Sequence, residues 1–431
     1  MDWLLQPEMT LETGSRWIDR FIADLADNTV GMDPYPIALR GMNWIKFIVV
    51  HQSDISGSSL RRWNDSLYSQ YRLLCRKLEY HLAGNHLLEN ACSLFMASIY
   101  FGDDRLYEKA EWLLVRELDE QILPDGAHYE QSLMYHCILL DRVLDCYNLS
   151  VANLRFADQE SVISVLREKA AIMAGHLKNM LYGDYSYPLF NDAALGIAPA
   201  PRELFFYAER LEISWTPKRL SECGYRFMRD DSVECFVDVG NIAASYQAGH
   251  SHADSFNYEL RIAGTPFVID TGTSTYEKNA RRQYERSTSA HNTVGMEGRD
   301  SSEVWGGFRM GKRAKVRLLE DSDNRIDAEH DGYAPVRHRR IFEMGKGKFA
   351  VTDLLSESKT GCSYIHLAPD VEVLVVSNTQ ITTSVAVIRI EGAGEVSVHS
   401  REVASTYNHL RSSQTVEMKF TDRMMYEIIP L

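Results

Sequence analysis

Apolar residues recur every three to four positions through the first half of the chain, which is the spacing of amphipathic helices. The stripe from Ser15 to Leu25 is typical, with Trp17, Ile18 and Phe21 on one face. The pattern predicts helices at residues 15–25, 37–50, 59–82, 87–100, 106–122, 129–149, 161–181 and 202–211. Because short connections join them, neighbouring helices should pair antiparallel. So many helical hairpins favour an α/α toroid over a four-helix bundle.

Residues 187–201 interrupt the helical pattern. Beyond about Trp215, apolar residues recur at every second position instead of every third or fourth. Alternation of polar and apolar residues predicts strands at residues 233–239, 256–262, 267–269, 348–351, 371–376, 385–390 and 424–429. Many short strands without intervening helices favour an antiparallel β-sandwich. The sequence therefore predicts an α+β multidomain protein, with a helical domain at 1–215 and a β-sandwich domain at 216–431.

Charge and composition narrow the classes of partner and compartment. The net charge is −14 over 431 residues, which makes a general nucleic-acid binder improbable on electrostatic grounds. Basic residues concentrate in residues 216–431, where an anionic ligand should bind. Seven cysteines without a CxxC pair predict no disulfide framework. No segment resembles a membrane span or a signal peptide, so we expect a cytoplasmic protein as written, or a periplasmic one if a signal is missing.

The segment from Gly249 to His291 is richest in residues that carry chemistry. His250 and His252 are two apart, so in an extended chain both imidazoles point to one side. Asp270 ends a predicted strand, and His291 follows a Ser/Thr-rich turn. Two histidines and an aspartate on adjacent strands suit a divalent ion, most simply zinc. The alternative is a cluster of hydrogen-bonded histidines without metal.

Two segments of the helical half also combine polar residues of chemical interest. In EYHLAGNHLLEN, Asn85 and Glu89 share a helix face with His86 beside them. A helix cap with a solvated neighbour would give the same pattern. In ILPDGAHYEQSLMYH, a Pro-Asp-Gly turn precedes a predicted helix that carries Tyr135. Tyrosines at helical spacing are usually packing residues, so neither segment alone predicts a site.

Together these segments resemble the heparinase II/III superfamily of polysaccharide lyases. The resembling motifs are MDPYPIALRGMNWIKF, EYHLAGNHLLEN, DGAHYEQSLMYH, GHSHADSFNYEL, VIDTGTSTYE and YERSTSAHNTV, in the same order and at similar spacing over more than 250 residues. The family joins an N-terminal α/α toroid to an antiparallel β-sandwich. The helical half is shorter here than in the largest members, so the resemblance implies an incomplete toroid.

The resemblance implies a role for each matching residue. Tyr135 matches the catalytic tyrosine and His250 the catalytic histidine. Asn85 and His86 match positions that meet the uronate, and Glu89 matches an acidic position near that subsite. The metal ligands match His252, Asp270 and His291. A further family tyrosine matches either Tyr276 or Tyr284, and the alignment leaves both open.

The implied reaction is β-elimination of a uronate-containing acidic polysaccharide. Asn85, His86 or protonated His250 would neutralise the uronate carboxylate, while Tyr135 would move a proton. Nearby cations would favour its phenolate form. The ion would hold the strands around His250 together, which is a structural role. Among three basic clusters, the one with Arg281, Arg282 and Arg286 lies in the motif region and should contact an acidic glycan.

Two other functions remain open at the level of sequence. A glycoside hydrolase would need two positioned carboxylates, and no pair is obvious. A non-catalytic acidic-glycan-binding protein of the same fold would have no need for an acid/base tyrosine with two histidines. An unsaturated uronate product would distinguish a lyase from both.

Overall fold

The structure is a computed structural model that describes residues 2–243 and 248–431. The chain forms two compact units, one of residues 1–121 and 139–170 and the other of residues 122–138 and 171–431. Helices α6 and α7 therefore contribute to both units. Within the described residues, no helix has the length and apolar character needed to cross a membrane.

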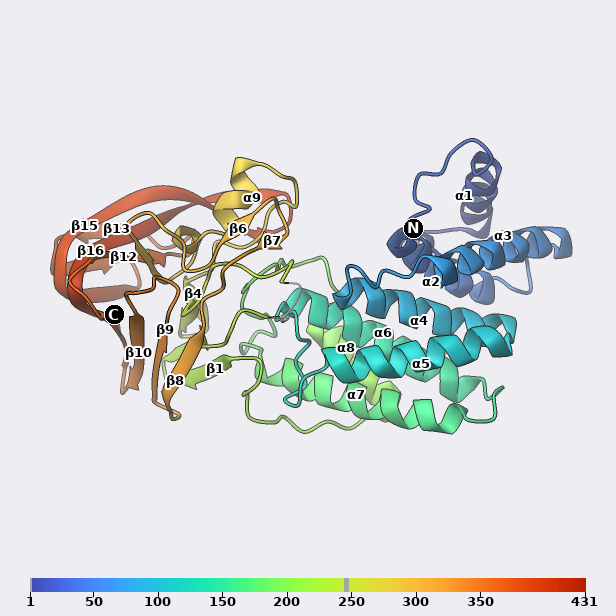
Figure 1. Ribbon diagram of the computed structural model, residues 1–431, viewed down its shortest axis with the longest axis horizontal. Helices are drawn as coiled ribbons and strands as arrows, with labels where there is room; N and C mark the ends of the chain where they lie inside the picture. Colours follow the sequence, from blue (N-terminus) through green and yellow to red (C-terminus); the bar gives the residue numbers. More distant parts are fainter. Residues whose placement is uncertain (1, 244–247) are drawn as a thin grey trace. The chain divides into compact units, whose positions relative to one another are not determined.

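The helical half closely follows the predicted pattern (Figure 1). Its helices are α1 (Leu11–Asp24), α2 (Pro34–Val50), α3 (Gly57–Arg76), α4 (Gly84–Phe101), α5 (Asp104–Gln121), α6 (Leu133–Ala152), α7 (Gln159–Asn179) and α8 (Pro201–Arg210), preceded by the 3₁₀ turn η1 (Asp2–Leu5). In the first unit α4 packs against α2 and α5. Helix α4 is buried on almost every side, which explains its nearly continuous apolar sequence.

Several predicted helix boundaries shift by three or more residues, and two of these shifts affect candidate site residues. The helix predicted at 59–82 ends at Arg76, and the helix predicted at 87–100 already begins at Gly84, so Asn85 and His86 lie in its first turn. The helix predicted at 129–149 starts only at Leu133. Ser132 caps it, since its hydroxyl accepts a hydrogen bond from the backbone of Tyr135 at 3.4 Å. Tyr135 therefore lies in the first turn of α6.

The second half of the chain folds into antiparallel sheets. A four-stranded sheet has the order β1 (Tyr225–Arg229), β2 (Val233–Asp238), β3 (Tyr258–Ile262) and β4 (Thr265–Val268). A ten-stranded sheet contains β5 (Val294–Met296), β8 (Val316–Asp321), β9 (Arg325–His330), β10 (His338–Gly345), β11 (Lys348–Leu355), β12 (Thr360–His366), β13 (Val373–Val376), β14 (Gln380–Thr383), β15 (Ala386–Thr406) and β16 (His409–Pro430). A small hairpin joins β6 (Val304–Trp305) to β7 (Arg309–Met310), and α9 (Ala280–Glu285) and η2 (Thr288–Ala290) follow β4.

The two large sheets share one hydrophobic core. Tyr258 and Phe267 of the smaller sheet and Phe342 and Phe349 of the larger one belong to the same buried cluster. The longest hairpin, β15–β16, turns at Tyr407–Asn408, where Asn408 adopts φ 60°. Asparagine tolerates that left-handed conformation better than most residues. The predicted α+β architecture, with helices first and antiparallel sheets after them, is confirmed.

Candidate active site

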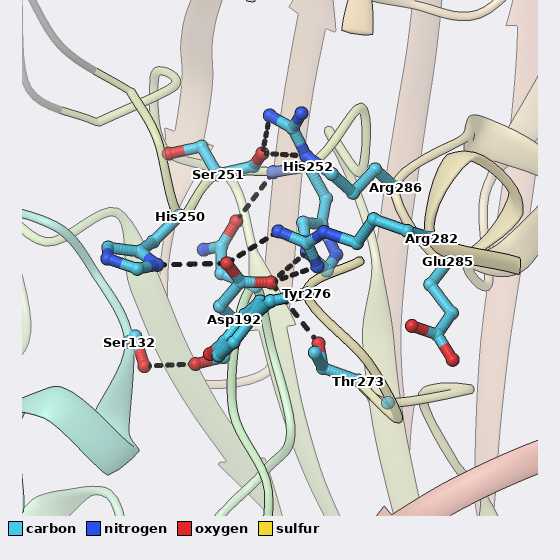
Figure 2. A network of polar contacts seen from close by, with 12 residues as sticks. Ser132, Asp192, His250, Ser251, His252, Thr273, Tyr276, Arg282, Glu285 and Arg286 are labelled. Atoms are coloured by element: carbon cyan, nitrogen blue, oxygen red, sulfur yellow. Dashed lines mark hydrogen bonds and ion pairs between the residues drawn. The ribbon is translucent and has the colours of Figure 1, made fainter. Parts of the chain in front are cut away.

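A buried carboxylate, Asp192, organises the most highly connected polar cluster of the second unit (Figure 2). It lies in the irregular segment between α7 and α8. The two oxygens of its carboxylate accept hydrogen bonds from His250 Nδ1 at 2.9 Å and His252 Nε2 at 2.8 Å. The guanidinium of Arg282 forms a bidentate pair with the same carboxylate, at 2.5 and 2.7 Å. Asp192 thus fixes the ring orientations of His250 and His252, which together are called the HxH motif.

The surrounding backbone holds Asp192 in place. Its amide donates to the carbonyl of His250, and its carbonyl accepts from the Ser132 hydroxyl at 2.6 Å. The side chain of Asn191 accepts from the His252 amide and donates to the hydroxyl of Tyr225. Ser132 also caps α6. Its hydrogen bond to Asp192 therefore connects the start of this helix to the loop that carries His250 and His252.

This arrangement brings Tyr135 against His250. Their ring centroids lie 4.2 Å apart, and the Tyr135 hydroxyl donates to the Tyr276 hydroxyl at 3.3 Å. Tyr276 also lies near His250, with ring centroids 6.2 Å apart, and under the guanidinium of Arg282. Tyr135, His250 and Tyr276 therefore form a triad of side chains that can transfer protons. Both tyrosines are half-buried.

Electrostatics at the site differ from the expectation for Tyr135. Burial raises the pKa of Tyr135, and the negative charge of Asp192 raises it further. Burial and Asp192 thus favour the neutral phenol of Tyr135, the form that donates a proton. Burial opposes ionisation of Asp192, but Arg282 and the two histidines outweigh it and hold the pKa of Asp192 well below its usual range. The hydrogen bond to ionised Asp192 selects the His250 tautomer with its proton on Nδ1.

The structure separates the two candidate tyrosines. Tyr276 contacts the hydroxyl of Tyr135, whereas the hydroxyl of Tyr284 has no hydrogen-bond partner among the described residues. The guanidinium of Arg281 lies 5.6 Å from the centroid of the Tyr284 ring. Tyr276 is thus the tyrosine that belongs to the triad.

Most of the arginines predicted to contact a glycan instead form hydrogen bonds or ion pairs inside the protein. Arg282 is 0% exposed and pairs with Asp192, and Arg286 is 1% exposed and donates to the Ser251 carbonyl. We therefore correct the substrate-contact assignment for both, because a buried guanidinium with protein partners cannot meet a polymer without losing them. Arg281 pairs with Glu285 at 2.7 Å but keeps part of its side chain exposed.

The predicted metal ligands lie in one buried region without converging on a single point. His291 Nδ1 hydrogen-bonds Asp270 Oδ2 at 2.8 Å, and the His252 and His291 ring centroids are 5.2 Å apart. Within the part of the chain that the structure describes, His252 Nδ1 and His291 Nε2 have no hydrogen-bond partner. Among residues 2–243 and 248–431, the one set of three ligand atoms within 4.8 Å of one another comes instead from Asp125, His176 and Cys223.

Asn85, His86 and Glu89 lie in the first unit, in the opening turns of α4. His86 stacks on Tyr35 and keeps 35% of its side chain exposed. Asn85 is 2% exposed, so its side chain is almost fully enclosed. Glu89 is buried and pairs with Arg142 at 3.0 Å, which corrects its predicted substrate contact. Of this motif, the side chain of His86 is the most accessible to a ligand.

Asp192 is the site residue that the sequence did not single out. One local signal was present: the segment YPLFNDAALG breaks the helical pattern and places Asn191 and Asp192 among apolar residues. Asn191 adopts φ 59°, an uncommon backbone conformation that marks a functional or turn position. A charged residue in an apolar, non-helical segment needs a partner, and here the partners are 58 to 90 positions away.

Comparison with known proteins places these residues in a family. The heparinase II/III N-terminus model matches residues 42–204, and the heparinase II/III-like C-terminal model matches residues 212–427. The chain is 24% identical over 325 residues to a heparin-sulfate lyase of Bacteroides thetaiotaomicron, an alignment that covers 64% of this chain and 44% of that protein. A heparin-sulfate lyase of Pedobacter heparinus is 23% identical over 318 residues, covering 66% and 46%. The chain thus aligns with less than half the length of these relatives.

Solved structures show the same fold. Heparinase III superposes with a TM-score of 0.80 at 18% identity, covering 98% of this chain and 74% of that one. The heparan sulfate lyase HepC from Pedobacter heparinus gives a TM-score of 0.64 at 16% identity, covering 98% and 73%. At these identities the superpositions establish a common architecture, and the site must be judged from its own residues.

Proposed function

Because the chain belongs to the heparinase II/III family, we propose that it is a polysaccharide lyase that cleaves a uronate-containing acidic glycan by β-elimination. The observation that carries the proposal is the contact of Tyr135 with His250, whose imidazole Asp192 orients. An elimination requires one group that accepts a proton and one that donates a proton, and these two adjacent side chains can do both.

The chemistry needs one proton removed and one supplied. A base takes the C5 proton of the uronate, the C4–O4 bond breaks, and a C4=C5 double bond forms. An acid protonates the departing O4, so atoms and charge balance. The uronate carboxylate delocalises the developing negative charge, and donors aimed at it lower the barrier.

The protonation states favour a division of roles. Tyr135 is neutral in the unliganded protein, so it is suited to protonate O4. His250, held by Asp192 in the Nδ1–H tautomer, has its basic lone pair on Nε2 and is suited to take the C5 proton. Tyr276 would steady the Tyr135 hydroxyl by their hydrogen bond. For Asn85 and His86, which lie in the first unit, the family resemblance implies that they bind and neutralise the uronate, and this role stays a prediction.

A divalent ion at His252, Asp270 and His291 remains part of the proposal. Two buried nitrogens, His252 Nδ1 and His291 Nε2, lack a hydrogen-bond partner among the described residues and are candidate ligands, whereas Asp270 already accepts the hydrogen bond of His291 Nδ1. Burial lowers the pKa of His252 to about 4, so its imidazole is neutral, as metal binding requires. When bound, the ion would cross-link the segments around His250 and His252, while the side chains would carry out the proton transfers.

The names of the relatives suggest the substrate class. Both curated relatives are heparin-sulfate lyases. We therefore propose a heparan-type glycosaminoglycan as the substrate. A glycoside hydrolase is less well supported, because Asp192 is saturated by Arg282 and two histidines and cannot serve as a nucleophile or base.

Digestion of a panel of acidic polysaccharides tests the reaction type. We expect heparan sulfate to yield products with the ultraviolet absorbance of a C4=C5 double bond conjugated to the carboxylate. Alginate and chondroitin sulfate serve as competing substrates, and heat-inactivated protein is the blank. New reducing ends without that absorbance would indicate hydrolysis, and binding without any product would indicate a glycan-binding protein; either result would overturn the lyase proposal.

Paired tyrosine variants test which second tyrosine contributes. Tyr276→Phe should lower turnover by about 2- to 13-fold, since loss of a hydrogen bond worth about 0.5–1.5 kcal/mol misplaces the Tyr135 hydroxyl. Tyr284→Phe removes a hydroxyl that has no partner and should leave turnover near that of the wild type. Initial rates of unsaturated product formation provide the measurement. Equal losses in both variants would contradict the assignment of Tyr276.

A further inference from the structure

A second cluster of metal-ligand side chains lies apart from the HxH loop. One ligand atom each from Asp125, His176 and Cys223 lies within 4.8 Å of the other two, and all three residues are buried. Asp125 follows α5, His176 lies near the end of α7, and Cys223 precedes β1, all within the second unit. We propose that these residues bind a structural zinc ion, distinct from the ion expected at His252.

The local structure fixes the three ligands before any ion binds. Gly126, at φ 89°, lets its loop approach the backbone of α7, where a Cβ would lie 2.1 Å from the Ile172 carbonyl oxygen. That carbonyl lies one helical turn before His176. The carboxylate of Asp125 accepts hydrogen bonds from the amides of Ser221 and Cys223, at 3.0 and 2.9 Å. Three segments distant in sequence are thereby held at one point.

The imidazole of His176 is prepared as a ligand. It is 2% exposed, it hydrogen-bonds the main chain of Asp125, and its Nδ1 has no hydrogen-bond partner among the described residues. Metal-binding histidines commonly use one ring nitrogen for a backbone carbonyl and the other for the ion.

Charge and donor type select the ion. Thiolate, imidazole and carboxylate together are a typical zinc donor set. A metal-bound cysteine is a thiolate, so coordination would ionise Cys223. Zn²⁺ with two anionic ligands then makes a neutral complex, which a buried site tolerates far better than a net charge. No fourth His, Cys, Asp or Glu joins the group in the described residues, so water or a carbonyl would complete the tetrahedron.

Cobalt substitution distinguishes this site from the one at His252, because only this one contains a thiolate. We expect metal-free protein loaded with Co²⁺ to develop a thiolate-to-cobalt charge-transfer band. Cys223→Ser should lose the band and one equivalent of metal, and His252→Ala should keep the band. Cys75→Ser, outside the cluster, is the matched control and should behave as wild type.

The site should also be visible in stability, without reference to activity. Zinc should raise the melting temperature of the chelated wild type, and this rise should shrink in Cys223→Ser. His176→Gln provides a second variant with the same expected losses if Cys223→Ser does not fold. A wild-type protein that takes up cobalt without the band, or a band that persists in both variants, would overturn the proposal. Failure of the lyase assay would not affect either measurement.

Discussion

Tyr135→Phe should lower turnover by about 10²–10⁴-fold while leaving the fold intact, because it removes the group that carries out one proton transfer but keeps the ring. The ring still packs against His250, with which its centroid distance is 4.2 Å. The lost groups are the hydroxyl and its hydrogen bond to Tyr276. Initial rates on the cleaved glycan, with circular dichroism to verify folding, provide the measurement.

The same variant distinguishes chemistry from binding. If Tyr135 is the acid for O4, kcat should fall with little change in KM, since the hydroxyl acts mainly in the transition state. Because burial and Asp192 raise the pKa of Tyr135, its neutral form should persist through the neutral pH range. A folded Tyr135→Phe protein with near-normal turnover would remove Tyr135 from the mechanism.

Asp192→Asn should destabilise the protein by about 3–5 kcal/mol, because it leaves the buried Arg282 guanidinium without a counter-charge. Turnover should also fall by about 10²-fold or more, because His250 loses the anion that sets its tautomer. Urea unfolding measures the first effect and kcat the second, at a temperature where the variant remains folded.

Two controls separate these effects. Asp353→Asn breaks another fully buried pair, in which Arg340 donates at 2.7 and 2.8 Å and His338 at 2.8 Å. It should cost similar stability and leave the turnover of the folded protein unchanged. Asp192→Asn combined with Arg282→Met removes both charges and should recover stability but not turnover. Recovery of both would show that Asp192 only holds the fold and does not orient His250.

The sequence determined the order and type of the main elements. Helical periodicity before residue 215 and alternation after it reflect burial of one face of each helix or strand, which is a local property. The same locality placed His250 and His252 together, since residues two apart share a side of an extended chain. The motif order added the family resemblance, which the matching models at 42–204 and 212–427 support.

The tertiary structure alone decided how the buried charges are paired. Arg282 seemed a surface cation in sequence, yet it is enclosed with Asp192, which lies 90 positions earlier. Glu89 likewise is paired with Arg142, 53 positions away. A buried charge is tolerated only with a partner, and the partner can come from any segment that the fold brings near. Sequence periodicity records which face is buried, whereas the identity of the neighbour depends on long-range packing.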